Sequence, residues 1–503
     1  MEKKGQIKAG AIITYISNIC SMLSSIVVTP IIINFIGNQE YGLYSLVYSI
    51  MGYFSVLDFG FGNAMIRYVS KTKAEKKDDK NINSLFLIIY SIIGIITLVV
   101  GTIIYFNLSN IFGNSLTPEE LSKANIMMII FLIGTAISFP LSVFDSYVLA
   151  NEKFIFLKVV NLVKILMNPI LIIFMLLLGY KSISLVVAYT VLNLMTHILY
   201  AVYSLIKLKM RITFNIKKID FSIFKEIIMY SFWVFLNIIV DTVFNNTDQV
   251  ILGIVSGTAA VSIYAVANQI KNANNAFSTA ISGLFLPKIT KLLTLNKKDE
   301  INETFINVSK IQLYIMLLIL SGFFIFGKAF ISLWVGNEYM DAYYIVLWLI
   351  GPSIIPLTQN LGISVIQAMN KHKFRSIVYI IIAILNILIS IPLSRKYAGI
   401  GAALGSAVAN LLGQCIAMNI YYYKVAGLDI IGYWKNFIKI VLPVALFSLV
   451  ISKIIQPMQF GWIKLIVYIG IYVMIYLIYI VVFHLSNDEK LYLRRKILRK
   501  ENK

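Results

Sequence analysis

The sequence has little charge and few of the side chains that hold metals or disulfides. Asp, Glu, Lys and Arg make up 13% of its residues, whereas a soluble globular chain has about 25%. The two cysteines, Cys20 and Cys415, lie in separate apolar stretches. That count allows neither a disulfide framework nor a zinc site. We therefore expect no metal and no cofactor, and a water-soluble enzyme is excluded.

Acidic residues are scarce relative to basic ones. The chain holds 44 Lys and Arg against 23 Asp and Glu, a formal net charge of +21. Nucleic-acid binding would need the basic residues on one soluble face, but they stand between apolar runs, so we expect no nucleic-acid partner. No polar gap is long enough for a soluble ATP-binding or catalytic domain. One stretch, Gly322 to Lys328, is similar to a phosphate-binding loop, but it is apolar and Ala329 replaces the hydroxyl that would hold magnesium.

Apolar sequence is abundant. Hydrophobic residues make up 59% of the chain, and a membrane-spanning helix needs about 20 mostly apolar residues. The polar breaks predict an all-α, polytopic membrane protein with about 14 transmembrane helices. The run after the basic N-terminus lacks a small-residue cleavage site, so we expect a first span and not a removable signal peptide. The expected helices are 10–36, 41–66, 83–106, 124–150, 156–179, 182–206, 226–252, 258–286, 307–333, 342–369, 376–394, 399–423, 437–455 and 462–484.

The distribution of basic residues predicts the orientation. With the N-terminus inside, the inner segments hold 34 of the 44 Lys and Arg, and the outer loops hold 6. Cytoplasmic loops of membrane proteins carry such an excess. We therefore expect a multi-pass protein of the cytoplasmic (inner) membrane with both termini in the cytoplasm.

The sequence contains an internal repeat with a period of about 220 residues. Gly37 and Tyr44 have the same separation as Gly257 and Tyr264. Two more pairs of segments, 149–154 with 368–374 and 167–171 with 385–389, follow in the same order. Six helices per repeat is an even number, so both lobes would share one orientation, as in parallel transporter repeats. We expect an N-terminal lobe at 1–222, a C-terminal lobe at 223–430, and two more helices with a basic cytoplasmic tail at 431–503.

Three stretches resemble bacterial polysaccharide and oligosaccharide flippases. Gly42 to Arg67, with Asp58, Gly60 and Gly62, is similar to the opening of these proteins; 248–267 is similar to the start of their second lobe, and 398–405 to their twelfth helix. The resemblance covers nearly the whole chain. It implies the superfamily that also contains lipid II flippases and multidrug and toxin extruders, whose members work by alternating access between two six-helix lobes around a central cavity.

The first helix departs from two of those relatives. Lipid II flippases carry arginines there, and one branch of the extruders carries an acidic residue. This chain has only Asn18, Ser21, Ser24 and Ser25 as polar residues in the matching part of the helix. The departure favours the polysaccharide branch, as does the expected number of spans, since the extruders have twelve.

Ionisable side chains inside the spans suggest a coupling site. A charge at the centre of a span costs about 2.5–3.5 kcal/mol on insertion scales, so it should face a cavity or a partner. In the helix at 226–252, Asn237, Asp241, Asn245 and Asp248 recur at a spacing that places them on one face. The candidates for binding a coupling ion, H⁺ or Na⁺, are Asp58, Asp145, Asp241 and Asp248. Asp58 could instead cap a helix in the Gly60 bend.

Basic and amide side chains suggest a substrate site. A lipid-linked sugar carries a diphosphate, which needs cations, and hydroxyl groups, which need side chains able to donate and accept. Lys164 and Lys271, one in each lobe, are the expected diphosphate ligands. The expected sugar ligands are Asn245, Asn268, Asn272, Gln359 and Asn360. Two alternatives stay open: the amides could join helices by hydrogen bonds, and the lysines could pair with Asp58, Asp145 or Asp241.

The function that these patterns predict is transport without catalysis. We expect a flippase that moves an undecaprenyl-diphosphate-linked oligosaccharide across the membrane for O-antigen, capsule or exopolysaccharide synthesis. Its partners would be this polyprenyl-diphosphate-linked oligosaccharide, membrane lipid, and the products of neighbouring polysaccharide polymerase and glycosyltransferase genes. The alternatives are a cation-coupled multidrug extruder or a lipid II flippase of the same fold. A membrane polymerase or ligase would need a larger outer loop.

Overall fold

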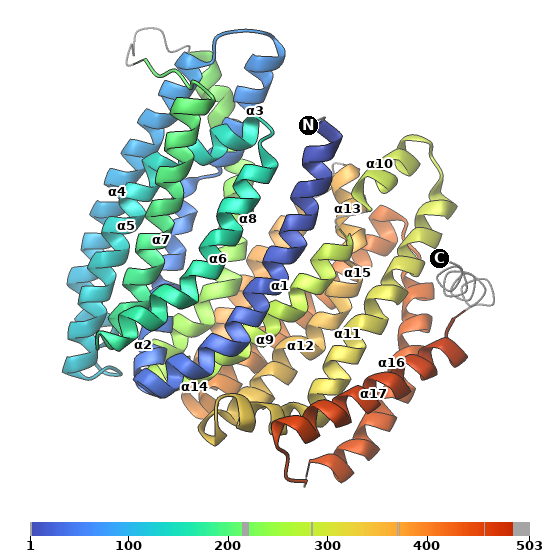
Figure 1. The fold of residues 1–503 in the computed structure, drawn as a ribbon. Helices are drawn as coiled ribbons and strands as arrows, with labels where there is room; N and C mark the ends of the chain where they lie inside the picture. The colour runs from blue at the N-terminus through green and yellow to red at the C-terminus, as the bar shows by residue number, and fades with distance from the viewer. Residues whose placement is uncertain are drawn as a thin grey trace, which may run out of the picture. The chain divides into compact units, whose positions relative to one another are not determined.

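The structure of the protein is a computed structural model that describes residues 3–213, 221–282, 285–369, 371, 373–456 and 458–485. Its regular secondary structure is entirely helical within those ranges (Figure 1). The predicted all-α class is therefore confirmed. Most helices are long because the apolar runs are long, and every backbone polar group in lipid must be satisfied within its own helix.

The helices of the first half of the chain are α1 (Lys3–Ile36), α2 (Asn38–Gly52), η1 (Tyr53–Asp58), α3 (Phe61–Ala74), α4 (Lys80–Phe112), α5 (Pro118–Ala150), α6 (Phe154–Leu177), α7 (Lys181–Val202), η2 (Tyr203–Lys207) and α8 (Phe221–Val255). Those of the second half are α9 (Gly257–Ser282), α10 (Leu286–Thr294), α11 (Lys298–Trp334), η4 (Asn337–Tyr339), α12 (Asp341–Thr358), α13 (Asn360–Ala368), α14 (Lys373–Asn410), η5 (Leu411–Ala417), α15 (Met418–Tyr421), η6 (Tyr422–Ala426), α16 (Ile430–Ile455) and α17 (Trp462–Phe483).

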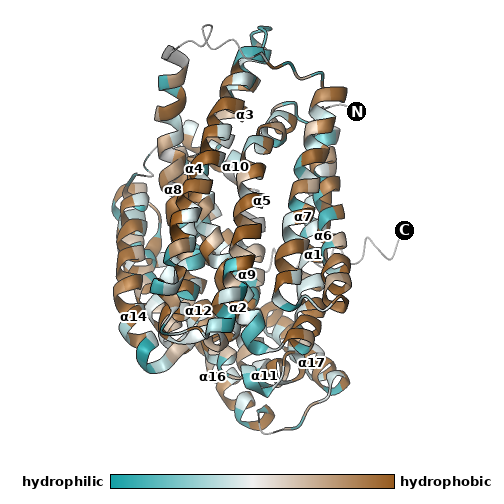
Figure 2. Ribbon diagram, turned by 90° about the vertical axis from the view of Figure 1, so that its left-hand side faces the viewer, coloured by the Kyte–Doolittle hydropathy of each residue, from teal (hydrophilic) through white to brown (hydrophobic). Residues whose placement is uncertain are grey.

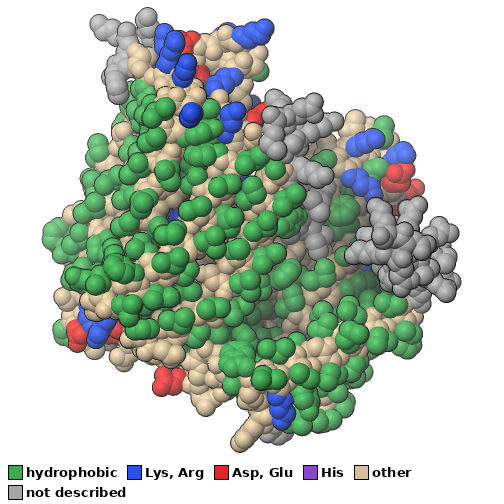
Figure 3. Space-filling view, viewed as in Figure 1, with side chains coloured by type: hydrophobic (Ala, Val, Ile, Leu, Met, Phe, Trp, Pro, Cys, Tyr) green, Lys and Arg blue, Asp and Glu red, His purple; other side chains and the backbone are tan. Residues whose placement is uncertain are grey.

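Eleven helices in the described part of the chain are long and apolar enough to cross a membrane. Figure 2 shows mainly hydrophobic residues along these helices, and Figure 3 shows apolar side chains over the helical surfaces with charged groups gathered near helix ends. The protein is therefore a multi-pass membrane protein. The expected fourteen spans are compatible with this set, because α14 contains a break at Ala398, and α2–α3 and α9 fall outside the eleven.

Internal contacts divide the chain into two compact units. Unit 1 comprises Met1–Val266 and Ala383–Gly405, and unit 2 comprises Ala267–Ile382 and Ser406–Lys503. These bounds differ from the expected lobes at 1–222 and 223–430, because α8 and the start of α9 pack with the N-terminal helices. The units are defined by internal contacts, whereas the lobes are defined by the sequence repeat. The lobes therefore stay a prediction.

Positive backbone φ angles mark the helix junctions. Gly37, between α1 and α2, has φ 83°, and Gly257, between α8 and α9, has φ 79°. Both angles lie in the region that glycine adopts without steric cost. The two junctions matched by the sequence repeat therefore share a glycine with a positive φ angle. A second bend follows η1, where Phe59 and Gly60 have φ 50° and 77° and divide the helix expected at 41–66.

Each unit has an apolar core of its own. In unit 1, Met65, Phe86 and Val143 are buried where α3, α4 and α5 pack. Gly94 permits a close approach of α4 to α5, since a Cβ there would lie 2.7 Å from the carbonyl oxygen of Ala136. In unit 2 the core lies between α11, α16 and α17, and includes Met316.

Candidate functional site

Lys164 lies in a chain of polar contacts inside unit 1. Its Nζ, on α6, donates to Asn193 Oδ1 on α7 at 2.8 Å, and Asn193 Nδ2 donates to Ser138 Oγ on α5 at 3.3 Å. The ammonium also lies 5.6 Å from the centroid of the Tyr189 ring. Lys164 is half-buried. Three apolar helices thus hold a lysine beside amide, hydroxyl and aromatic groups, a set that can bind phosphate and sugar.

Asp145 and His197 form an ion-pair geometry between α5 and α7. Nδ1 of His197 lies 3.0 Å from Oδ1 and 2.9 Å from Oδ2 of Asp145. The side chain of Asp145 is 29% exposed and that of His197 is 14% exposed, so the pair is partly accessible. His197 follows Asn193 by one helical turn on α7, which places both pairs on the same face of that helix.

Asp58 lies in the bend between η1 and α3. Its Oδ1 accepts a hydrogen bond from Tyr90 Oη at 2.5 Å, and its Oδ2 accepts one from the Gly60 amide at 3.2 Å. The second bond satisfies an amide at the start of α3, as a capping side chain does. These contacts fit the capping alternative for Asp58, and its role in ion coupling stays a prediction.

Asp248 is buried at the centre of a second polar cluster in unit 1. Its Oδ2 accepts from Tyr264 Oη on α9 at 2.5 Å, and its Oδ1 accepts from Asn386 Nδ2 on α14 at 3.2 Å. Ser390 donates to Asn386 Oδ1 at 2.5 Å. Gly405 makes room for this serine, because a Cβ there would lie 2.2 Å from Ser390 Oγ. Donors from two neighbouring helices therefore hold the Asp248 carboxylate in place, and its role in ion coupling stays a prediction.

The other residues of the α8 stripe lie in different surroundings. Asp241 and Asn245 are exposed, and Asn245 Nδ2 donates to the Asp241 carbonyl oxygen at 2.8 Å. The side chain of Asn237 is outside the described residues. The residues of this helical face therefore differ in burial: Asp248 contacts α9 and α14, whereas Asp241 and Asn245 are exposed.

Lys271 and its neighbouring amides lie on the α9 segment of unit 2. Lys271 is half-buried, Asn272 is exposed and Asn268 is buried. Oδ1 of Asn268 has no hydrogen-bond partner among the described residues. Lys164 and Lys271 belong to different units, so their expected meeting in one cavity stays a prediction.

Gln359 and Asn360 take part in contacts between helices of unit 2. Gln359 Nε2 donates to Asn419 Oδ1 at 2.9 Å, and Asn419 Nδ2 returns a bond to Gln359 Oε1 at 3.0 Å. Asn360 Nδ2 donates to Ser278 Oγ at 2.7 Å. Gln359 is buried and has both of its amide atoms engaged, as expected for an amide that joins helices. Sugar binding by these two residues stays a prediction.

A line of hydrogen bonds, here called the α2–α8 seam, joins α2 and η1 to α8 within unit 1. Ser49 Oγ donates to Gln249 Oε1 at 2.5 Å, the hydroxyls of Tyr53 and Thr247 lie 2.6 Å apart, and those of Ser55 and Thr242 lie 3.2 Å apart. The two helices approach closely at Gly253, where a Cβ would lie 2.4 Å from Leu46 Cδ1. The seam therefore joins segments that the repeat assigns to different lobes.

Glu40 and Glu120 in unit 1 accept hydrogen bonds from side chains near the starts of other helices. Glu40 on α2 accepts from Lys123 Nζ on α5 and from Ser182 Oγ on α7, at 2.5 Å for the serine. Burial raises the pKa of the Glu40 carboxyl, but the Lys123 and Ser182 hydrogen bonds outweigh it and leave the pKa below its ordinary value. Glu120 accepts from Thr258 Oγ1 on α9 at 2.7 Å.

Several of these residues were not expected from the sequence. Tyr264 and Asn386 stand out there only as partners in the internal repeat, and Ser390 does not stand out at all. The signal that could have found them is their helical spacing to each other: Ser390 follows Asn386 by four positions. Among the described residues, no group of three or more His, Cys, Asp or Glu could hold a metal ion.

The fold is similar to the folds of a solved lipid flippase and a solved multidrug transporter. It superposes on the lipid II flippase MurJ in an inward closed conformation with a TM-score of 0.73 and 19% identity, covering 94% of this chain and 98% of that one. An inward-facing multidrug transporter of the MATE family gives a TM-score of 0.64 and 12% identity over 86% of this chain and 96% of its own.

Residues 7–293 match the family described as polysaccharide biosynthesis protein, and the chain belongs to this family. It is 21% identical over 199 residues to a probable low-salt glycan biosynthesis flippase of Haloferax volcanii, which covers 40% of this chain and 42% of that protein. It is 27% identical over 194 residues to a protein of Escherichia coli named as an O-antigen transporter, 38% of this chain and 45% of that one. The chain thus spans less than half the length of the curated relatives it matches.

Proposed function

We propose that this protein is a flippase for an undecaprenyl-diphosphate-linked oligosaccharide. It would carry the head group from the cytoplasmic to the outer leaflet by alternating access, for the synthesis of a surface polysaccharide such as O-antigen, capsule or exopolysaccharide. No bond of the substrate is made or broken. The observation that supports the proposal is that a member of this family holds a half-buried lysine, Lys164, among amides and hydroxyls inside its membrane helices.

Each part of the substrate has a candidate ligand. Lys164 and Lys271 would bind the diphosphate, because an ammonium is a mobile point charge that adapts to phosphate oxygens. Asn245, Asn268 and Asn272 would bind sugar hydroxyls, and the unpartnered Oδ1 of Asn268 supports this role. Gln359 and Asn360 would support the site from the helices that they join. The polyprenyl tail would stay in lipid.

The energy would come from an ion gradient. Asp145 and Asp248 are the leading candidates for binding H⁺ or Na⁺, because each carboxylate lies in a polar contact between membrane helices. Asp241 would line the water-filled path, since an exposed carboxylate on a membrane helix needs water around it. Asp58 would position the bend between α2 and α3.

The location of the protein follows from its charge distribution. The excess of basic residues in alternate loops supports the cytoplasmic (inner) membrane with both termini in the cytoplasm. The substrate would come from membrane-bound glycosyltransferases, and the flipped product would be used by a polysaccharide polymerase. The first helix lacks the arginines of lipid II flippases, which favours an oligosaccharide over lipid II.

Reconstitution into vesicles tests the proposal. Full-length protein is placed in vesicles that contain a short undecaprenyl-diphosphate oligosaccharide, and a glycosidase outside the vesicles reports which head groups have crossed. We expect wild-type protein to expose the inner pool and Lys164→Gln to slow this strongly, while Lys158→Gln on the same helix has little effect. Equal rates with and without protein would contradict the proposal, as would transport of a cationic dye but not of the glycolipid.

A further inference from the structure

A large apolar cavity lies in unit 2 between α11, α12 and α16. Its volume is about 510 Å³, within the range of about 300–1,000 Å³ that is usual for pockets that hold small ligands. Its wall includes Leu317 and Phe324 of α11, Trp348 and Gly351 of α12, and Val441 and Leu449 of α16. Trp348 and Leu449 are exposed, so the cavity opens onto the surface of unit 2.

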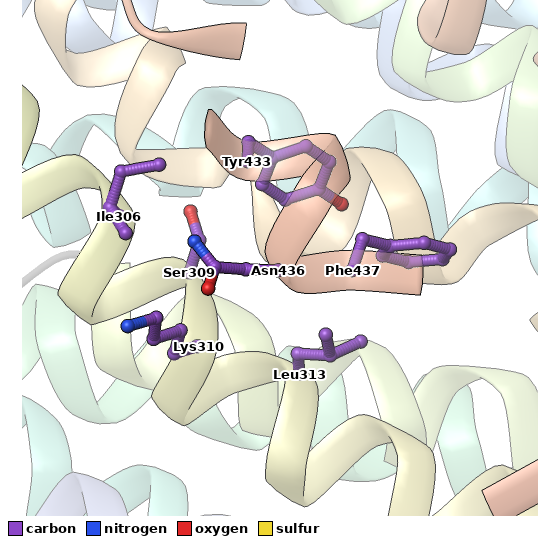
Figure 4. Close-up of a pocket in the computed structure, with 7 residues that line it drawn as sticks. All are labelled: Ile306, Ser309, Lys310, Leu313, Tyr433, Asn436 and Phe437. Carbon is purple, nitrogen blue, oxygen red and sulfur yellow. The ribbon is translucent and has the colours of Figure 1, made fainter. Parts of the chain in front are cut away.

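A second hollow between α11 and α16 is far smaller. It lies beside Ser309 and Lys310 (Figure 4), and its volume of about 10 Å³ has room for roughly one water molecule. The two helices therefore pack closely over that stretch, and a ligand-sized space opens farther along α11, from Leu317.

The hydroxyl groups in the wall of the large cavity are bonded within the protein. Ser321 Oγ donates to the Leu317 carbonyl oxygen at 2.5 Å and accepts from Tyr472 Oη of α17 at 2.5 Å. Ser448 Oγ donates to the Val444 carbonyl oxygen at 2.7 Å. Apolar cavities stay free of ordered water, and the three helices are apolar enough to span a membrane. We therefore expect hydrocarbon to fill this cavity in a bilayer.

A lysine lies at one end of the cavity. Leu317, Phe324 and Lys328 recur at helical spacing, so Lys328 continues the face of α11 that lines the cavity. Its Nζ lies 5.6 Å from the centroid of the Tyr344 ring, which is itself part of the wall. The same Nζ lies 5.3 Å from the centroid of the Tyr343 ring. The ammonium is therefore at the mouth of the cavity.

Hydrogen bonds join the three helices beside this mouth. Tyr343 Oη of α12 donates to the Phe324 carbonyl oxygen at 2.9 Å, and Gln456, directly after α16, donates to the same oxygen at 3.2 Å. Gly351 lies two turns farther along α12 than Tyr344, and a Cβ there would have no atom within 4 Å. The helices are thus held together at the mouth and leave open space at Gly351.

Aromatic side chains mark the membrane interface near Lys328. This lysine precedes Trp334, the last residue of α11, by six positions. Phe330 stacks on Trp334 with ring centroids 5.2 Å apart, and meets Trp462 of α17 edge-on at 6.3 Å. Trp and Tyr concentrate at the level of lipid head groups, and the long stem of a lysine can reach that level from inside a span. In the orientation proposed above, this end of α11 lies in the outer leaflet.

We propose that this cavity binds one phospholipid of the outer leaflet, with an acyl chain between α11, α12 and α16 and the phosphate at Lys328. An ammonium on a flexible stem adapts to phosphate oxygens. A polyprenyl chain is much longer than an acyl chain, so the size of the cavity favours the phospholipid. The site goes beyond flipping, because it holds a lipid in its own leaflet, where the chain connects α16 to α11 and α12.

Lipid titration tests the site. Full-length protein, freed of lipid in detergent, is titrated with phosphatidylglycerol, and native mass spectrometry and thermal unfolding report binding. We expect the wild type to retain one lipid and to unfold at a higher temperature with it. Gly351→Leu fills the cavity and should lose most of this binding. Lys328→Gln should weaken it about fivefold, the effect of one lysine near a charged membrane surface, and Lys328→Arg should keep it.

Two controls match these variants. Gly470→Leu on α17 also adds a side chain where a Cβ has no atom within 4 Å. Lys464→Gln removes another lysine that lies over an aromatic ring, 5.2 Å from the centroid of Phe460. Neither residue lines the cavity, so both variants should bind phosphatidylglycerol like the wild type.

Several results would overturn the proposal. Wild-type binding by Gly351→Leu or by Lys328→Gln is one. Equal binding of glycerophosphoglycerol, which has no acyl chains, would replace the lipid with a soluble anion. Tighter binding of undecaprenyl phosphate, lost in Gly351→Leu, would assign the cavity to a polyprenyl tail. If Gly351→Leu unfolds at a lower temperature without lipid, Lys328→Gln and the head-group comparison decide. None of these results bears on the oligosaccharide flippase, whose vesicle assay follows a different substrate.

Discussion

Nδ1 of His197 faces both carboxylate oxygens of Asp145, at 3.0 and 2.9 Å, inside a helix pair that is otherwise mostly apolar. Lys164 contributes a favourable charge to the same carboxylate. Unit 1 therefore has a local set of one carboxylate, one ammonium and one imidazole. This relationship places the lysine proposed to bind the diphosphate near the carboxylate proposed for coupling.

Loss of the imidazole should separate the structural from the coupling role of this pair. His197→Gln leaves Asp145 with a poorer partner, so we expect a loss of about 1–3 kcal/mol in stability and lower polymer export. Adding Asp145→Asn should restore protein abundance without restoring the pH dependence of transport. The measurements are abundance by immunoblot and vesicle transport at several pH values. The control is Thr196→Val, since the Thr196 hydroxyl donates to the Leu192 carbonyl oxygen on its own helix. Unchanged pH dependence in His197→Gln would remove the pair from coupling.

The charge at position 164 should determine how much polymer each variant exports. Arg keeps the charge but changes it from a point to a planar fork, and Gln removes it, so we expect wild type above Lys164→Arg, and Lys164→Arg above Lys164→Gln. Asn193→Leu should reduce export less than Lys164→Gln, because it removes the amide between Lys164 and Ser138 but keeps the charge of the lysine. Export is measured at matched protein levels. Full export by Lys164→Gln would show that the diphosphate is bound elsewhere.

The Asp248 cluster allows a test of fold against coupling. Tyr264→Phe removes a hydrogen bond to a carboxylate and should lower stability by roughly 1.5–3 kcal/mol. Asp248→Asn keeps the size of the side chain, and we expect it to abolish gradient-dependent flipping while the protein still inserts and folds. Thermal unfolding and vesicle transport with and without an imposed gradient distinguish the two effects. Gradient-dependent transport by Asp248→Asn would assign Asp248 to structure alone.

Acid should weaken the contact between Glu40 and Lys123. The folded-state pKa of Glu40 lies below its ordinary value, so its contribution to stability is present above the unfolded pKa, near 4.3, and is lost as pH falls through the folded value. Between neutral and strongly acidic pH, the unfolding temperature of wild type should therefore fall more than that of Glu40→Gln. Equal falls in the unfolding temperature of the two proteins would show that Glu40 does not contribute to the pH dependence of stability.

Cysteine labelling tests the orientation. In a background without Cys20 and Cys415, Glu75→Cys should react only from the cytoplasm and Asn114→Cys only from outside, because both positions are exposed and lie at opposite ends of α4. Asn114 is a better position than Ser115, which donates to the Gly253 carbonyl oxygen at 2.6 Å. Reaction of Asn114→Cys with a cytoplasmic reagent alone would reverse the topology.

The fold could be predicted further than the site. Long apolar runs specify membrane helices almost by themselves, because lipid leaves the backbone few other choices, and the Gly37 and Gly257 junctions were visible as a repeated pattern. The partners of Asp248 could not be read in the same way. Helical spacing put Asp241 and Asp248 on one face, but it carried no information on where α9 and α14 would cover that face. Gln359 shows the same limit, because an amide that binds sugar and one that joins Asn419 look identical in a sequence.

The α2–α8 seam contains only neutral hydrogen bonds. Polar contacts between membrane helices average about 0.6 kcal/mol each, so its three bonds together amount to about 2 kcal/mol, roughly a thirtyfold preference at equilibrium. Water can replace a hydroxyl or an amide partner without exposing a bare charge to lipid. Under the alternating access proposed above, the hydrogen bonds of the seam would therefore add only this much to the apolar packing that holds α2 against α8.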